Sequence, residues 1–151
     1  MEDLIALMKT VLASAFALYL KTHSFHWNVE CADFPQYHEF FKNQYEDIWA
    51  SVDDIAEQIR QLDAYAPGSM DRFIQLSKVS GESGVPSPRE MVLKLLHDNE
   101  IMIVLLTEAC NMATKENKQG LANFLAGRLE AHNKHRWMLR ATAKKYSKGV
   151  E

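Results

Sequence analysis

Two histidines and two carboxylates have the residue types and the spacing of a metal site. His26 follows the apolar run of the first long segment, His38 comes soon after it, and Asp53 and Glu57 lie four positions apart. Residues four apart share one face of a helix, so both carboxylates could bind a single ion. Imidazole and carboxylate together suit iron, zinc or manganese. The alternative for the acidic pair is an ordinary solvated helix face.

The spacing argues against a complete site within one chain. Di-iron bundles commonly supply Glu-x-x-His from two helices, and no histidine of this sequence has a glutamate three positions before it. His38 and Asp53 are 15 positions apart, which on one helix is roughly 22 Å at about 1.5 Å per residue. His26 can fold back toward His38 across a short loop. We therefore expect a two-fold pair of subunits in which the histidines of one copy meet the carboxylates of the other.

Helical periodicity predicts four long helices to position these groups. Apolar residues recur at helical spacing over positions 4–19 and again over 41–62. The third helix is expected from about Pro88 to Lys115, with Ser87 as its N-cap, and the fourth from about Gln119 to Tyr146. No segment alternates with a period of two, so we expect no strands.

A long connection over residues 64–87 separates the second and third long helices. Within it, residues 69–76 could form a short extra helix capped by Ser69. Helices of about 25 residues are about 38 Å long and suit a bundle, and one long crossover is the ferritin-like connectivity. The predicted fold is therefore all-α: a single ferritin-like domain over residues 1–151, a four-helix bundle with a short helix in its crossover.

Composition limits the classes of partner and compartment. The chain has 151 residues, 47% hydrophobic and 25% charged, enough for one domain with a substantial core. Its net charge of -3 gives no overall attraction to nucleic acid phosphates. Two cysteines outside any CxxC pair fit a reducing compartment, so we expect a cytoplasmic protein. The apolar run between Lys9 and Lys21 follows an acidic start and is too short to span a bilayer, so no membrane association is expected.

Several motifs together resemble the Dps family, the DNA-protection-during-starvation miniferritins. These are His26-Trp27-Asn28, then His38, then VDDIAEQIRQLD with Asp53 and Glu57, the crossover segment PGSMDRFIQLS, and HNKHRWMLRAT in the fourth long helix. The resemblance extends over nearly the whole chain. It implies a hollow dodecameric homo-oligomer with ferroxidase centres at two-fold interfaces. The centres would oxidise Fe(II), preferably with hydrogen peroxide, store ferric mineral and protect against oxidative stress.

The resemblance also assigns the site residues one by one. It makes His26 and His38 iron ligands from one subunit, and Asp53 and Glu57 ligands from its two-fold mate, with Trp27 packed beside the centre. Zinc is the substitute metal that such ligands would also accept.

Lys42 is the main departure from the family pattern. Four residues after His38, on the same helix face, the family has an acidic ligand, and here the residue is lysine. A protonated ammonium group cannot bind a metal and repels a second Fe(II). We predict one firm iron position per centre, a second that is weak or absent, and slower oxidation. The alternative is that Lys42 pairs with Glu46, or with Glu57 of the mate, and swings clear of the iron.

Two other functions remain open at this point. One is a DNA-compacting shell with a vestigial metal site, but helical periodicity begins by Leu4 and leaves no room for a basic N-terminal tail, which argues against DNA binding. Lys144, Lys145 and Lys148 at the other end are most simply a solvated terminus. The second is a structural cage with a zinc-filled or empty site, which Lys42 makes more credible.

The remaining histidines have simpler interpretations. His23, one turn before His26, is expected to be an exposed polar neighbour, with assistance to His26 as the alternative. His97, His132 and His135 have no matching carboxylate set in the sequence. We interpret the HNKHR run as a charged outer face with Trp137 packed behind it. Three acidic residues, Glu46, Asp47 and Asp54, are expected either to line a mineral cavity or to lie on a solvated face.

Overall fold

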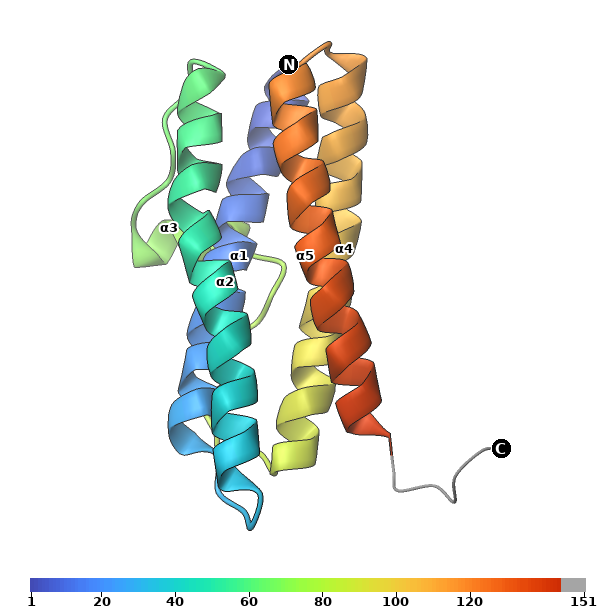
Figure 1. The fold of residues 1–151 in the computed structure, drawn as a ribbon. Helices are drawn as coiled ribbons and strands as arrows, with labels where there is room; N and C mark the ends of the chain where they lie inside the picture. The colour runs from blue at the N-terminus through green and yellow to red at the C-terminus, as the bar shows by residue number, and fades with distance from the viewer. Residues whose placement is uncertain (145–151) are drawn as a thin grey trace, which may run out of the picture.

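Four long helices and one short helix make up the part of the chain that the structure describes. The computed structural model describes residues 1–144, and no strand occurs among them. This confirms the all-α bundle (Figure 1). In chain order the helices are α1 (Glu2–Asn28), α2 (Phe34–Gln61), α3 (Met70–Leu76), α4 (Pro88–Lys115) and α5 (Gln119–Ala143).

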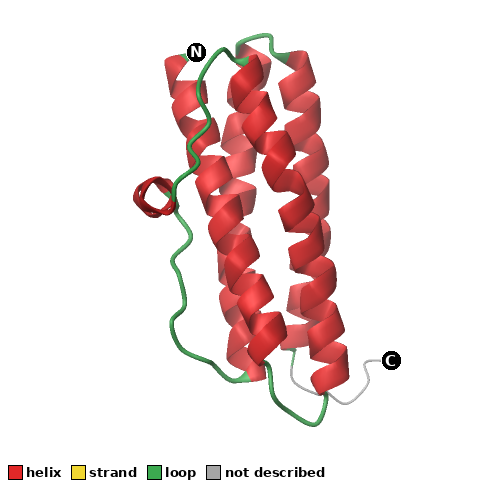
Figure 2. Cartoon of the chain, turned by 90° about the vertical axis from the view of Figure 1, so that its left-hand side faces the viewer, coloured by secondary structure: helices red, strands yellow, loops and turns green. Residues whose placement is uncertain are grey.

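The connectivity follows from one long crossover. α1 packs against α2, α4 packs against α5, and α1 joins the two pairs through its contact with α4. Figure 2 shows the segment between α2 and α4 running the length of the bundle, with α3 partway along it. α3 packs against α1. Because this connection returns to the opposite end before α4 begins, α2 and α4 run in the same direction, as the length of the link predicts.

Local capping explains where two of the helices begin. The Ser87 hydroxyl accepts a hydrogen bond from the Glu90 amide at 3.3 Å, and the Glu90 carboxylate accepts one from the Ser87 amide at 3.3 Å. This capping box starts α4 and confirms the predicted N-cap. Ser69 caps α3 in the same way, accepting from the Arg72 amide at 3.2 Å. α5 ends at Ala143, and the predicted extension to Tyr146 lies outside the described residues.

α1 is the most apolar of the helices, and its apolar residues form the centre of the core. Leu4, Met8, Leu12, Leu18 and Phe25 are all buried at helical spacing along it. By length and composition alone this helix could also cross a membrane, and 44% of its most apolar window is buried inside the bundle. A helix that contacts α2, α3 and α4 needs apolar residues on more than one face, which accounts for its composition.

Candidate metal centre

The end of α1 and the start of α2 bring His26 and His38 together. The connecting loop is short, and its Val29 is buried against the core, which turns the chain tightly. The two imidazole rings stack with centroids 3.7 Å apart and an interplanar angle of 12°. His26 is 8% exposed, and His38 is half-buried. The fold therefore places both predicted histidine ligands at one end of the bundle.

Reciprocal hydrogen bonds orient these two rings. The Nδ1 atom of His26 lies 2.6 Å from the backbone oxygen of His38, and the Nδ1 atom of His38 lies 2.7 Å from the backbone oxygen of His26. A carbonyl oxygen only accepts hydrogen bonds, so each Nδ1 must carry the proton and donate it. In the neutral rings the Nε2 atoms then carry the lone pairs. This is the tautomer in which an imidazole can bind a metal through Nε2.

An aromatic cluster lies beside the histidine pair and includes His23. The His23 ring stacks on Tyr45 with centroids 3.9 Å apart and lies 4.1 Å from the ring of Trp27. Its Nδ1 atom is 2.9 Å from the Tyr19 hydroxyl. Burial, followed by the charge of His26, lowers the pKa of His23. The expectation of an exposed polar neighbour was wrong, because rings from α1 and α2 enclose this side chain on the face next to the histidine pair.

Trp27 lies at the edge of this cluster. Its ring contacts His23, and its side chain remains 57% exposed in the single chain. The structure therefore places Trp27 next to the histidines and leaves most of its surface uncovered.

The predicted carboxylates form a separate cluster near the other end of α2. Ligand atoms of Asp53, Asp54 and Glu57 all lie within 4.8 Å of one another, and the three residues are exposed. Asp54 was not among the predicted ligands, although it directly follows Asp53 in the sequence. The histidine and carboxylate clusters remain apart on one helix, as the count of positions between them requires. Each chain thus presents two separate clusters, which we call the half-sites of the predicted centre.

Lys42, the predicted departure from the family pattern, lies on α2 between the two half-sites. It lies one turn after His38 on α2 and is half-buried. Within residues 1–144 no carboxylate lies within 4 Å of its ammonium group, so the predicted pairing with Glu46 is not formed. Pairing with Glu57 of a second subunit remains a prediction. The charge of Lys42 is therefore not neutralised by an ion pair within the described chain.

A second polar cluster lies inside the bundle, between α2 and α5. The Arg128 guanidinium donates two hydrogen bonds to the Asp47 carboxylate, at 3.0 and 2.9 Å, and His135 Nε2 lies 2.7 Å from the same carboxylate. Burial alone would raise the pKa of Asp47. Hydrogen bonds from His135 and Arg128, together with their charges, instead hold it well below its usual range. Asp47 is therefore a structural anchor and not part of a plain solvated face, and its role in lining a mineral cavity stays a prediction.

His132 continues this cluster toward α4. Its Nδ1 atom lies 2.8 Å from the Asn99 side-chain oxygen, and the Asn99 amide donates to the His132 backbone oxygen at 2.9 Å. Burial, followed by the charges of Arg128 and His135, lowers the pKa of His132 to about 3. We call the five residues Asp47, Asn99, Arg128, His132 and His135 the interior cluster.

The interior cluster corrects the interpretation of HNKHR as a charged outer face. His132 is 1% exposed and His135 is 8% exposed, whereas Trp137 is 65% exposed. The inward face of α5 continues through Leu125 and Leu139, which are spaced to share a stripe with the two histidines. The polar character of the histidines concealed this stripe. Hydrogen bonds to Asn99 on α4 and Asp47 on α2 offset the cost of burying the two histidines. These partners are distant in the sequence, so no local signal reveals them.

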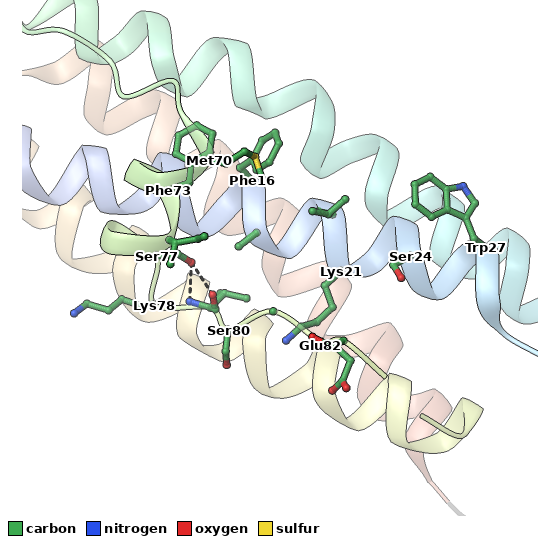
Figure 3. A pocket seen from close by; sticks show the side chains of 16 residues that line it. Phe16, Lys21, Ser24, Trp27, Met70, Phe73, Ser77, Lys78, Ser80 and Glu82 are labelled. Atoms are coloured by element: carbon green, nitrogen blue, oxygen red, sulfur yellow. Dashed lines mark hydrogen bonds between the residues drawn. The ribbon is translucent and has the colours of Figure 1, made fainter. Parts of the chain in front are cut away.

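A groove of about 720 Å³ lies between α1 and the crossover (Figure 3). Its lining is mostly apolar, with Phe16, Trp27, Met70 and Phe73 on its walls. At its base Lys21 forms a buried ion pair with Asp98 of α4 at 2.6 Å. Trp27 belongs both to this groove and to the aromatic cluster. The groove and the exposed ring of Trp27 therefore form one continuous apolar surface that begins beside the histidine pair.

Comparison with known proteins places this geometry in a family. A family model described as a ferritin-like domain matches residues 5–148. A DNA protection during starvation protein of Helicobacter pylori is 30% identical over 136 residues, covering 89% of this chain and 94% of that protein. The chain belongs to the Dps family of ferritin-like proteins.

Two further comparisons extend over almost the whole chain. A low temperature-induced protein of Nostoc is 36% identical over 142 residues, covering 93% of this chain and 79% of the relative. The crystal structure of Dps from Thermosynechococcus elongatus has a TM-score of 0.93 at 24% identity, covering 96% of this chain and 92% of that one, and shows that the fold is shared. Membership of the Dps family supports an iron-binding miniferritin function at the general level.

Proposed function

We propose that this Dps protein is a ferroxidase and iron store. It binds Fe(II) at centres shared between two subunits, oxidises the iron with hydrogen peroxide, and retains the ferric product as mineral inside a shell built from its own copies. The outcome is protection against oxidative stress, because iron and peroxide are consumed together. The observation that carries the proposal is the pair His26 and His38, whose backbone hydrogen bonds leave both Nε2 atoms able to bind a metal.

The two half-sites supply complementary chemistry. Neutral imidazoles from His26 and His38 bind Fe(II) without adding charge. Carboxylates from Asp53 and Glu57 add negative charge, which favours Fe(III) over Fe(II) and so assists oxidation. Asp54 extends the acidic cluster and is a candidate to draw the incoming cation toward the centre.

Two copies in an antiparallel, two-fold arrangement would join these half-sites. The histidine end of α2 in one copy would then meet the carboxylate end of α2 in the other, giving two equivalent centres for each pair. The exposed surface of Trp27 and the apolar groove beside it would be covered by the mate. The dodecameric shell proposed for the complete assembly comes from the family resemblance.

Lys42 sets the expected capacity of each centre. Its positive charge lies one turn from His38 and has no ion-pair partner within the described chain, so a second Fe(II) beside the first would be repelled. Anaerobic Fe(II) calorimetry is expected to give one tight site per centre, and Lys42→Asp is expected to give two. Two tight sites in the unmutated protein would refute this expectation.

Subunit mixing tests the shared centre directly. One variant carries His26→Ala and His38→Ala, and the other carries Asp53→Asn and Glu57→Gln. Each alone is expected to be inactive in peroxide-dependent Fe(III) formation. After unfolding and joint refolding, half of the random pairs are mixed and each has one intact centre, so about one quarter of the native activity should return. No recovery from a mixture that forms normal oligomers would refute the inter-subunit site.

A further inference from the structure

Tyr19 and His23 form a hydrogen-bonded pair within the aromatic cluster beside the proposed centre. The Tyr19 hydroxyl lies 2.9 Å from His23 Nδ1, in a partly buried setting. In the tautomer with the proton on Nε2, His23 Nδ1 accepts the phenolic hydrogen. This places a proton acceptor in direct contact with a phenol, a side chain that can lose one electron when its proton has an acceptor.

Ring contacts connect this pair to the iron ligand His26. The Tyr45 ring lies 5.1 Å from the His26 ring and 3.9 Å from the His23 ring, measured between centroids. Tyr45 also lies 6.2 Å from Tyr19, and His23 lies 5.8 Å from His26. Tyr19 is therefore joined to a proposed iron ligand by two routes, each passing through a single intervening ring. Such contacts allow an electron to leave Tyr19 for an oxidant at the iron.

The reduction of peroxide requires more electrons than a single Fe(II) can supply. Reducing one peroxide molecule to hydroxide and water takes two electrons, and one Fe(II) supplies one. A centre with two irons supplies both. A centre that Lys42 restricts to one iron needs another donor, or it releases hydroxyl radical.

We propose, resting on the proposed ferroxidase function, that Tyr19 supplies the second electron and His23 accepts its phenolic proton. The overall step is Fe(II) + H2O2 + Tyr–OH giving Fe(III) + OH⁻ + H2O + Tyr–O•. The O–O bond breaks, Fe(II) and the phenol each lose one electron, and the peroxide oxygens gain both. The phenolic proton moves to His23 Nδ1 as the electron leaves, and passes from there to the hydroxide formed from peroxide, which becomes the water. His23 thus acts as the proton acceptor for the redox step.

The hydrogen bond selects Tyr19 among the aromatic residues of the cluster. A phenol that loses an electron becomes strongly acidic. Its oxidation is therefore easiest where the hydroxyl already donates a hydrogen bond to a base. Among residues 1–144 the Tyr45 hydroxyl has no hydrogen-bond partner, although its ring is nearer to His26. The Trp49 ring also contacts the Tyr19 ring, with centroids 4.7 Å apart, and Trp49 is 53% exposed. It is placed to carry the oxidising equivalent outward from Tyr19.

Freeze-quench electron paramagnetic resonance tests the proposal on the assembled protein. Hydrogen peroxide is added to anaerobic, Fe(II)-loaded protein, and samples are frozen at increasing times. The expected signal is a tyrosyl radical whose hyperfine structure narrows with ring-deuterated tyrosine. It should be lost in Tyr19→Phe and retained in Tyr45→Phe, which removes the hydroxyl and keeps the ring. Tyr65→Phe, at an exposed position on the link after α2, is the matched control and should also retain it.

Stoichiometry and a second iron give independent readouts. The unmutated protein should oxidise one Fe(II) per peroxide in the first turnover, and Lys42→Asp should oxidise two and lose the radical signal. His23→Gln should weaken the tyrosyl signal while leaving the Fe(II) isotherm in place, an effect that a purely structural role would not produce.

The outcomes separate this inference from the function on which it rests. Fe(III) formation with an unchanged radical in Tyr19→Phe, or with no radical in the unmutated protein, overturns the role of Tyr19 and leaves the ferroxidase intact. Absence of Fe(III) formation after peroxide addition overturns both.

Discussion

The interior cluster and the histidine pair use similar side chains and differ in what is left unpaired. In the interior cluster, Asp47 accepts three hydrogen bonds from Arg128 and His135, and His132 is bound to Asn99. At the end of the bundle, the backbone satisfies one nitrogen of each ring and leaves the other available. Histidine is thus part of a structural anchor in one place and a proposed metal ligand in the other. The difference lies in which atoms the fold has already satisfied.

Removing one histidine from the pair should give the largest effect. His38→Ala removes a proposed iron ligand and the stacked partner of His26, so Fe(II) affinity is expected to fall by more than the roughly 10–100-fold typical of losing an outer-sphere contact. Anaerobic titration calorimetry measures the change.

The matched variant for this test is His135→Ala in the interior cluster. It should leave the Fe(II) isotherm unchanged wherever the protein remains folded. Equal losses of iron affinity in both variants would remove the distinction between the two regions.

Two aspartates on α2 should differ in the opposite sense when stability, and not iron binding, is measured. Asp47→Asn removes the charge that Arg128 and His135 share, and because Asp47 is about one third exposed we expect a loss of about 2–3 kcal/mol, below that of a fully buried pair. Asp53→Asn, on the exposed face, should change the free energy of unfolding by less than about 0.5 kcal/mol. Urea denaturation of both variants measures these values.

The second readout for the same two variants is Fe(III) formation after peroxide addition. Activity should be reduced in Asp53→Asn and preserved in Asp47→Asn. A stability loss in Asp53→Asn comparable to that in Asp47→Asn would contradict the assignment of the two clusters.

The pH dependence of stability should report on His132. Its pKa is about 3 in the folded chain and about 6.5 when unfolded, so the unfolded state binds more protons between these values. Its contribution is therefore complete above pH 6.5 and is lost as pH falls toward 3. Arg128, His135 and Asp47 are the charged groups that act on it.

The size of this effect is about 1.5 kcal/mol between pH 6.5 and pH 5, from the linkage of protons to unfolding. Urea denaturation at the two pH values measures it, with His132→Gln as the control, since the other histidines remain. A pH dependence as steep in the variant as in the parent would show that His132 is not the group responsible.

The last variant removes an exposed cap that belongs to neither region. Ser87→Ala removes one half of the capping box at the start of α4 and should cost about 1 kcal/mol of unfolding free energy. Fe(II) binding should be unaffected, because α4 contributes no proposed ligand. A loss of iron affinity in this variant would mean that general destabilisation explains the other results as well.

Features with a local cause were predicted from the sequence. Ser87 and Ser69 cap the helices that they were predicted to cap. The long link between α2 and α4 is a crossover, as its length predicted, since a connection between neighbouring helix ends would need far fewer residues. The approach of His26 to His38 followed from a short loop between two helices. Each of these depends on residues that are close together in the chain.

Features that depend on distant residues were not predicted. The pairing of Asp47 with His135 joins residues 88 positions apart, and a buried polar stripe on α5 has the same appearance in the sequence as an exposed one. The tautomers of His26 and His38 depend on where two backbone carbonyls point after folding. The ligand roles of the four site residues remain predictions that the mixing experiment tests.

The reciprocal bonds between His26 and His38 are formed within one chain, so each newly folded copy already holds its imidazoles in working orientation. In the proposed centre, the acidic half arrives only when another copy docks. Fe(II) oxidation would then begin when two copies associate, without a rearrangement inside either copy. A cell making little of this protein would leave its iron untouched, and iron consumption would rise more steeply than the amount of protein made.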